Sequence, residues 1–194
     1  MFNFKFRIMK KILFLLACSI VALSSFAQEE VPGIYYSNEK LSYSRIIGKN
    51  VSNIAGAYFT LGLSSAKSNK IIEGENAETE IKEKKPEFTI IFGEDKQTGY
   101  IFSNARNIDN ILLIQLHEKK GKRNLRTGEY GLAGVKTGID EKDVIPLSIE
   151  KVENNKIKVH PKSNLKKGEY CFYYFGEAPS EEGTFNGVFD FSIK

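Results

Sequence analysis

Apolar residues recur at every second position through most of the chain, in short runs bounded by Gly, Asn, Pro or Lys. This alternation is typical of β-strands that bury one face. The run 88–92 predicts a central strand that begins after Pro86, and the run 188–194 predicts a half-buried last strand. The sequence is therefore expected to fold as strands rather than helices.

Pairs of such runs, joined by short polar segments, predict three hairpins. They are 33–36 with 41–47 across the connection 37–40, 112–116 with 123–127 across 119–122, and 145–149 with 157–159 across 153–155. Pro146 has no backbone donor, so we expect the third hairpin to begin at a sheet edge or at a strand start.

The remaining segments are less regular. Residues 57–63 predict a strand weakened by Gly62, and residues 64–85 predict a short strand with loops, with a helix over 77–84 as the alternative. Leu165 and Gly168 before Tyr170 suggest a tyrosine corner, in which the phenol binds the incoming loop.

About nine short strands without a long helical period predict an all-β fold, either an antiparallel β-sandwich or a partly open barrel. The composition, 41% hydrophobic and 27% charged, is that of a folded chain. We expect a single β-sandwich-like domain over residues 28–194. A boundary near Pro86 is the alternative, because the charged stretch 78–87 has the composition of a linker.

The first 27 residues have the three parts of a signal peptide. Four basic residues lie within positions 1–11, an apolar run follows over 12–23, and Ala27 ends a small-residue cleavage site before Gln28. Translation starts at Met1 or at Met9. We therefore expect an exported protein, periplasmic or extracellular.

Two alternatives use the same leader. Leu15 to Cys18 resembles a lipoprotein cleavage box, which would leave the protein lipid-anchored through Cys18; the short apolar run before Cys18 disfavours it. A transmembrane anchor is not expected, because 12–27 is shorter than the ~20 residues that span a bilayer.

The charge balance argues against nucleic acid as a partner. The chain has 28 basic and 24 acidic residues, and four of the basic ones lie in the leader, so residues 28–194 are neutral overall. A neutral chain has no summed field to attract nucleic acid or anionic lipid.

Candidate catalytic groups are few. The histidines, His117 and His160, are expected to be structural or surface residues, since no nucleophile motif accompanies them. Cys171 is the only cysteine after the leader, and its aromatic neighbours predict a buried, unreactive thiol.

No metal or cofactor is expected. The carboxylates of 140–143 lack a calcium-loop register, so a solvated loop is favoured. Lys136 and Thr137 lie among Gly128, Gly131, Gly134 and Gly138, but Val135 replaces the glycine that a phosphate loop needs before its lysine. The glycines are instead expected to allow positive φ or close packing. The charge runs 78–87 and 119–123 are expected to be solvated.

Tyrosines offer one possible ligand platform. Tyr35, Tyr36 and Tyr43, together with Tyr173 and Tyr174, could stack on sugars, but packing between sheets is favoured.

Residues 111–194 resemble a set of uncharacterised secreted bacterial β-rich domains. The resemblance rests on Arg123 with Gly128, Gly138-Ile139-Asp140, Pro161, Leu165-x-x-Gly168-Glu169-Tyr170-x-Phe172 and Phe189-Asp190-Phe191-x-Ile193, and more loosely on Gly33-Ile34-Tyr35-Tyr36. It implies a secreted β-rich fold and no catalytic residue.

We therefore expect a noncatalytic, exported envelope domain with a binding or scaffolding role and a protein or glycan partner. The alternatives are a carbohydrate-binding module and, third, an unrecognised hydrolase.

Overall fold

The computed structural model describes residues 31–93, 110–174 and 187–194. Pro32–Lys194 form one compact unit. The predicted signal peptide, both candidate start residues and Cys18 lie outside the described residues. No helix in the described part of the chain is long and apolar enough to span a bilayer.

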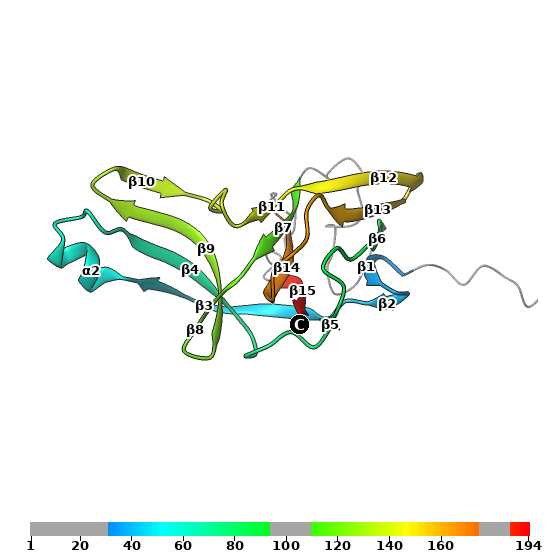
Figure 1. The fold of residues 1–194 in the computed structure, drawn as a ribbon, viewed down its shortest axis with the longest axis horizontal. Coiled ribbons are helices and arrows are strands. Elements are labelled where there is room, and N and C mark those ends of the chain that lie inside the picture. Colours follow the sequence, from blue (N-terminus) through cyan, green and yellow to red (C-terminus); the bar gives the residue numbers. More distant parts are fainter. Residues whose placement is uncertain (1–30, 94–109, 175–186) are drawn as a thin grey trace, which may run out of the picture. The chain divides into compact units, whose positions relative to one another are not determined.

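The described residues form two antiparallel sheets, which confirms the all-β prediction (Figure 1). The five-stranded sheet has the order β12 (Leu147–Glu153), β13 (Lys156–Pro161), β6 (Phe88–Ile91), β1 (Gly33–Tyr36), β2 (Glu39–Lys40). Strand β6 lies at its centre, as the run 88–92 predicted.

The ten-stranded sheet is curled into a half-barrel. Its main order is β10 (Gly134–Thr137), β9 (Lys122–Gly131), β4 (Ala66–Ile72), β3 (Tyr43–Ser52), β15 (Gly187–Ile193), β14 (Gly168–Tyr174), β7 (Ile111–Gln115), β11 (Val144–Ile145). Strand β8 (His117–Lys119) pairs with β9, and β5 (Glu80–Ile81) lies parallel to β15. Several strands are only two or three residues long, so the strands outnumber those that the sequence predicted.

The main core lies between the two sheets. Phe88 of the small sheet packs against Phe172 and Phe191 of the large one, with ring centroids 4.9 and 4.8 Å apart. Aromatic pairs at this spacing bury large areas and add a directional contribution. Interleaved aromatic rings therefore join the layers.

A second buried cluster occupies the other face of the large sheet. It combines Ile72 of β4 and Leu125 of β9 with Ile114 of β7 and Cys171 of β14. These strands are separated in the sheet by β3 and β15, so the sheet must curl to bring their side chains together. The curl also explains why every residue of β15 is buried. The prediction of a half-buried last strand was wrong, because both faces of that strand meet a core.

Of the three predicted hairpins, the third is present and the second is present only in part. Strands β12 and β13 pair across the expected turn, and β12 begins immediately after Pro146 at the edge of the small sheet. In the second hairpin, β8 and β9 pair around Lys120 and Gly121, which both have positive φ. The run 112–116 was expected to pair with 123–127 but lies mainly in β7, whose two edges pair with β14 and β11 instead.

The first hairpin differs from the prediction. Ser37 and Asn38 have φ values of 49° and 68°, so they form a tight turn between β1 and the very short β2. The run 41–47 was expected to pair with 33–36 but lies mainly in β3 of the large sheet.

Residues 57–63 do not form a strand. The short helix α2 (Ile54–Phe59) and a turn replace it, starting after Asn53 in the left-handed conformation. Residues 64–85 contain β4, β5 and loops, so the strand-and-loop prediction was right and the helix over 77–84 is absent.

The tyrosine corner is confirmed. Tyr170 is buried on β14, and its hydroxyl donates to the Lys166 carbonyl at 2.9 Å. The bond fixes the loop that enters the strand.

A charged cluster lies inside the domain. Arg123 of β9 is only 1% exposed and donates to Asp190 of β15 and, at 3.4 Å, to Glu169 of β14. Glu169 also accepts from the Ala77 backbone at 2.8 Å. The prediction that 119–123 is solvated throughout was wrong for Arg123, because two carboxylates on neighbouring strands compensate its burial.

Candidate docking surface

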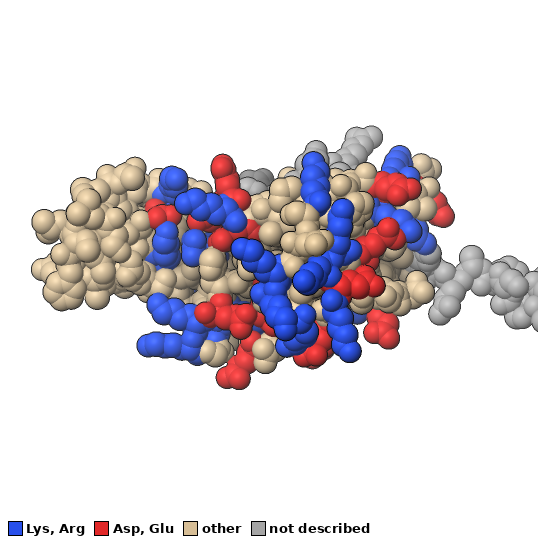
Figure 2. Space-filling model, in the orientation of Figure 1, with Lys and Arg blue, Asp and Glu red and all other residues tan. Residues whose placement is uncertain are grey.

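The far end of the large sheet has an unusual composition. We define the tip as residues 53–66, which connect β3 to β4 and include α2, together with residues 130–135 around the β9–β10 turn. Neither segment contains Lys, Arg, Asp or Glu. On the face drawn in Figure 2, the end of the molecule where α2 lies shows no charged side chain.

Apolar side chains are concentrated on this tip. Of the 13 large apolar side chains that are exposed among the described residues, eight belong to it. They are Ile54, Tyr58, Phe59, Leu61, Leu63, Tyr130, Leu132 and Val135. Tyr58, Phe59, Leu61 and Leu63 are 79–85% exposed, so they contribute almost nothing to either core. Exposed apolar groups gathered in this way mark interaction surfaces.

Polar side chains of the tip form hydrogen bonds within the tip itself. Asn53 donates through Nδ2 to Ser64 Oγ at 2.7 Å and to the Ser65 carbonyl at 2.8 Å. Thr60 donates to the Gly56 carbonyl at 2.7 Å and accepts from the Ser64 backbone at 2.8 Å. These bonds hold the loop in a fixed conformation while its apolar side chains face outward.

The two segments of the tip contact each other. The Leu132 backbone donates to the Gly62 carbonyl at 2.9 Å. A Cβ on Gly62 would lie 3.1 Å from Leu132 Cγ, and Gly62 has a φ of +86°, so glycine is required there. Gly134 and Gly138 also have positive φ, which confirms the conformational role predicted for these glycines.

Charged residues begin at one row of cross-strand neighbours. Lys67 of β4 pairs in register with Glu129 of β9, which pairs with Lys136 of β10. The Lys67 Nζ lies 2.6 Å from Glu129 Oε1, and the hydrogen bond from Lys67, followed by that from Ser65, lowers the pKa of Glu129. On the tip side of this row, the described chain has no charged side chain.

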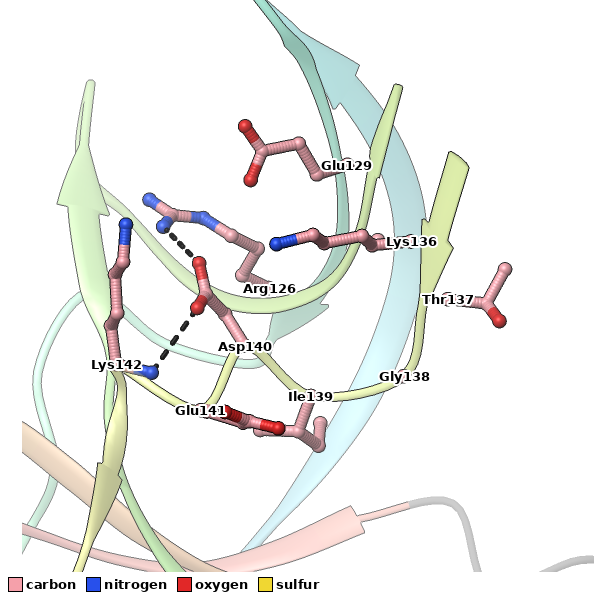
Figure 3. Close-up of a pocket in the computed structure, with 10 residues that line it drawn as sticks. Arg126, Glu129, Lys136, Thr137, Gly138, Ile139, Asp140, Glu141 and Lys142 are labelled. Carbon is pink, nitrogen blue, oxygen red and sulfur yellow. Dashed lines mark hydrogen bonds and ion pairs between the residues drawn. The ribbon is translucent and has the colours of Figure 1, made fainter. Parts of the chain in front are cut away.

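A pocket of about 360 Å³ lies behind the row, on the other side from the tip. Figure 3 shows Arg126 and Asp140 facing each other within it, with Arg126 Nη1 3.0 Å from Asp140 Oδ2. Burial opposes ionisation of Asp140, but bonds from the Lys142 backbone and from Arg126 still lower its pKa. Asp140 is thus engaged by the protein itself.

Lys136 and Thr137, the residues considered for a phosphate loop, point in different directions. Lys136 extends towards Arg126 and Glu129, whereas Thr137 points away from them (Figure 3). Successive residues of a strand face opposite sides of the sheet, so the two side chains do not converge on one ligand.

His117 lies 2.7 Å from Asp143, measured from Nε2 to Oδ2, and neither residue lines the pocket. Arg126 Nη1 is 3.8 Å from the same Asp143 oxygen. His160 lies on β13, away from His117 in the other sheet. Among the described residues, no three His, Cys, Asp or Glu side chains are grouped so that they could hold a metal ion.

Cys171 is fully buried, as its aromatic neighbours predicted. Burial raises the pKa of its thiol well above the ordinary value. A thiol in this state is a poor nucleophile at neutral pH.

The candidate tyrosines do not share one surface. Tyr36 and Tyr43 pack against the main core, where Tyr36 lies 5.9 Å from Phe88 and Tyr43 lies 5.8 Å from Phe189 between ring centroids. Tyr35 faces the opposite side of β1 from Tyr36. Sugar binding by these residues stays a prediction.

Comparisons with protein families, curated proteins and solved structures found no match to this chain. The geometry of the tip is therefore the main guide to function. Sequence reasoning did not identify it, although the uncharged stretch between Lys49 and Lys67 was a usable signal.

Proposed function

We propose that this protein is an exported, noncatalytic binding domain of the bacterial envelope that docks through its tip. The main supporting observation is the set of eight apolar side chains exposed on a loop pair fixed by its own hydrogen bonds. A rigid apolar surface gains free energy on docking without a large ordering cost.

In this fold, the residues that stabilise the domain are different from the apolar residues that the tip exposes. Both cores are complete without the exposed tip side chains, since the two buried clusters contain none of them. The apolar residues of the tip thus stay available for a partner. The leader and the resemblance to secreted domains support export.

Site-specific photo-crosslinking tests the docking role. Full-length chains carrying Leu61→p-benzoylphenylalanine or, as a control, Val152→p-benzoylphenylalanine would be produced in bacteria and irradiated. Val152 is exposed on β12 of the other sheet. We expect a covalent adduct with an envelope protein or lipid from position 61 and none from position 152. Equal adducts from both positions, or none from position 61, would reject the tip as the docking surface.

Intact mass tests export separately. We expect the secreted chain to begin at Gln28. A diacylated chain beginning at Cys18 would show instead that the protein is lipid-anchored, and an uncleaved leader would contradict export as proposed.

A further inference from the structure

We propose that the partner of the tip is a phospholipid bilayer, into whose headgroup boundary the tip inserts. The inference rests on the proposed docking function and specifies its partner. Three properties of the tip support lipid over a protein surface: where its charge ends, how its polar groups are satisfied, and which side chains it exposes.

The charge boundary is a line across the sheet. Lys67, Glu129 and Lys136 are in-register neighbours on three adjacent strands, so they lie side by side at the same height. Ser52 of β3 extends the row on the far side of Lys67. Every described residue beyond the row is uncharged. A straight limit of this kind matches a flat interface between water and hydrocarbon, where charged groups stay at the surface.

The Asn, Thr and Ser side chains of the tip have hydrogen-bond partners within the protein, as insertion into a bilayer requires of them. Hydrocarbon offers no hydrogen-bond partners, so inserted backbone and side-chain groups must be satisfied within the protein. Asn53, Thr60 and Ser64 bond to one another or to the local backbone, and Ser65 bonds to Glu129. A protein interface, by contrast, typically gains about one hydrogen bond per 100–200 Å² from its partner.

The exposed side chains are those of an interfacial anchor. Phe59, Leu61, Leu63 and Leu132 provide apolar area for insertion, while Tyr58 and Tyr130 have hydroxyl groups suited to headgroup depth. The tip thus offers apolar side chains that can be buried in the membrane, and the adjacent row places Lys67 and Lys136 at the level of the headgroups.

The charge near the tip differs from that of the whole chain, and this affects which lipids we expect the tip to prefer. Residues 28–194 are neutral overall, so no long-range field steers the protein to anionic lipid. Near the tip, however, the segments 49–70 and 128–137 contain four lysines, Lys49, Lys67, Lys70 and Lys136, and a single acidic residue, Glu129. Insertion should therefore occur on zwitterionic lipid and be strengthened by anionic lipid within a Debye length.

Vesicle flotation tests the proposal. Residues 28–194, which include the whole compact unit, would be mixed with phosphatidylcholine vesicles or with vesicles that also contain phosphatidylglycerol. We expect flotation with both, strengthened by phosphatidylglycerol at low salt. The double variant Leu61→Ser and Leu63→Ser should lower the partition coefficient at least tenfold, since two large apolar groups no longer enter the membrane.

The control is Ile149→Ser with Val152→Ser, two exposed apolar residues of β12 in the other sheet. It should leave partitioning unchanged, and circular dichroism should show the same β-rich spectrum for every variant. Wild-type protein that fails to float, or an equal loss in the control, overturns the lipid assignment. Concentration-dependent dimerisation that requires Leu61, without flotation, would assign the tip to a second copy of the chain instead.

The two proposals fail separately. A protein adduct at position 61 without vesicle binding would overturn lipid as the partner and keep the tip as a docking surface. Absence of both the adduct and flotation would overturn both proposals.

Discussion

The two ends of the large sheet both depart from the usual distribution, in which charged residues are exposed and apolar residues are buried. Near β14 and β15, charged groups are buried: Arg123, Glu169 and Asp190 are at most 3% exposed. At the tip, Phe59 and Leu61 are more than 80% exposed. Strands β3, β4 and β9 are shared by both regions, so the difference arises from side chains rather than from a change of fold.

The difference separates stability from function. A buried ion is tolerated only when its partners compensate the loss of water, so removing one partner leaves an expensive charge behind. An exposed apolar side chain stabilises little, and its replacement costs the fold little. Substitutions in the two regions should therefore have opposite consequences, with unfolding in one and loss of docking in the other.

The largest expected effect follows Arg123→Met. The change leaves Asp190 and Glu169 buried without their cation, which should lower the free energy of unfolding by about 3–5 kcal/mol. Urea denaturation measures it. The matched control is Arg45→Met, because the pair between Arg45 and Glu73 is solvent-exposed and its loss should lower the free energy of unfolding far less. Similar losses in both variants would contradict the role of the buried cluster.

Comparing the pH dependence of stability in wild type and Asp190→Asn tests the role of the buried cluster in a second way. Burial raises the pKa of Asp190 above 3.8, although Arg123 opposes the shift. A raised pKa means that native Asp190 binds its proton more tightly than the unfolded chain does. The stabilisation from this proton is therefore complete below the unfolded pKa and is lost as the pH rises through the native pKa. Wild type should gain stability relative to Asp190→Asn as the pH falls from about 7 towards about 4.

Unfolding curves of both proteins across this range provide the measurement. Relative loss of stability in the wild type on acidification would mean that the Arg123 ion pair, rather than burial, determines the pKa of Asp190.

A smaller effect is expected from Tyr170→Phe. The change removes the hydrogen bond to the Lys166 carbonyl and should cost about 1 kcal/mol. Tyr58→Phe is the control, since that ring is 79% exposed on the tip and its loss of a hydroxyl should not alter stability. An unchanged denaturation midpoint for Tyr170→Phe would show that the corner bond does not stabilise the loop.

The smallest effect on stability is expected at the tip. Leu61→Ser should change the free energy of unfolding by no more than about 0.5 kcal/mol, because the side chain is 85% exposed. Leu125→Ala, a buried position on β9, should cost about 2–5 kcal/mol. If Leu61→Ser were as destabilising as Leu125→Ala, the tip would belong to the core.

Local patterning predicted much of the fold. Alternation identified the strands around Phe88 and Ile157, and the motif before Tyr170 predicted its corner bond. The pairing of Arg123 with Asp190 could not be predicted in this way, because 67 residues separate them and the charges of 119–123 suggested a solvated turn. Only the curl of the sheet brings the two strands together.

The tip was missed for a different reason. The sequence predicts a strand over 57–63, which places Tyr58, Phe59, Leu61 and Leu63 in a sheet rather than in an exposed loop. The stretch 50–66 is uncharged but lacks sustained alternation, and that combination distinguishes an exposed apolar loop from a half-buried strand. Its exposure depends on the hydrogen bonds of Asn53 and Thr60, which no periodicity reveals.

Depth-resolved fluorescence quenching measures insertion of the tip into a bilayer. The chain contains no tryptophan, so Phe59→Trp introduces a single reporter at the tip and Val152→Trp a matched one on β12. With vesicles of brominated phosphatidylcholine, we predict a blue shift and strong quenching for position 59 and neither for position 152. Emission at position 59 that stays that of a water-exposed indole, unquenched at saturating lipid, would contradict insertion of the tip.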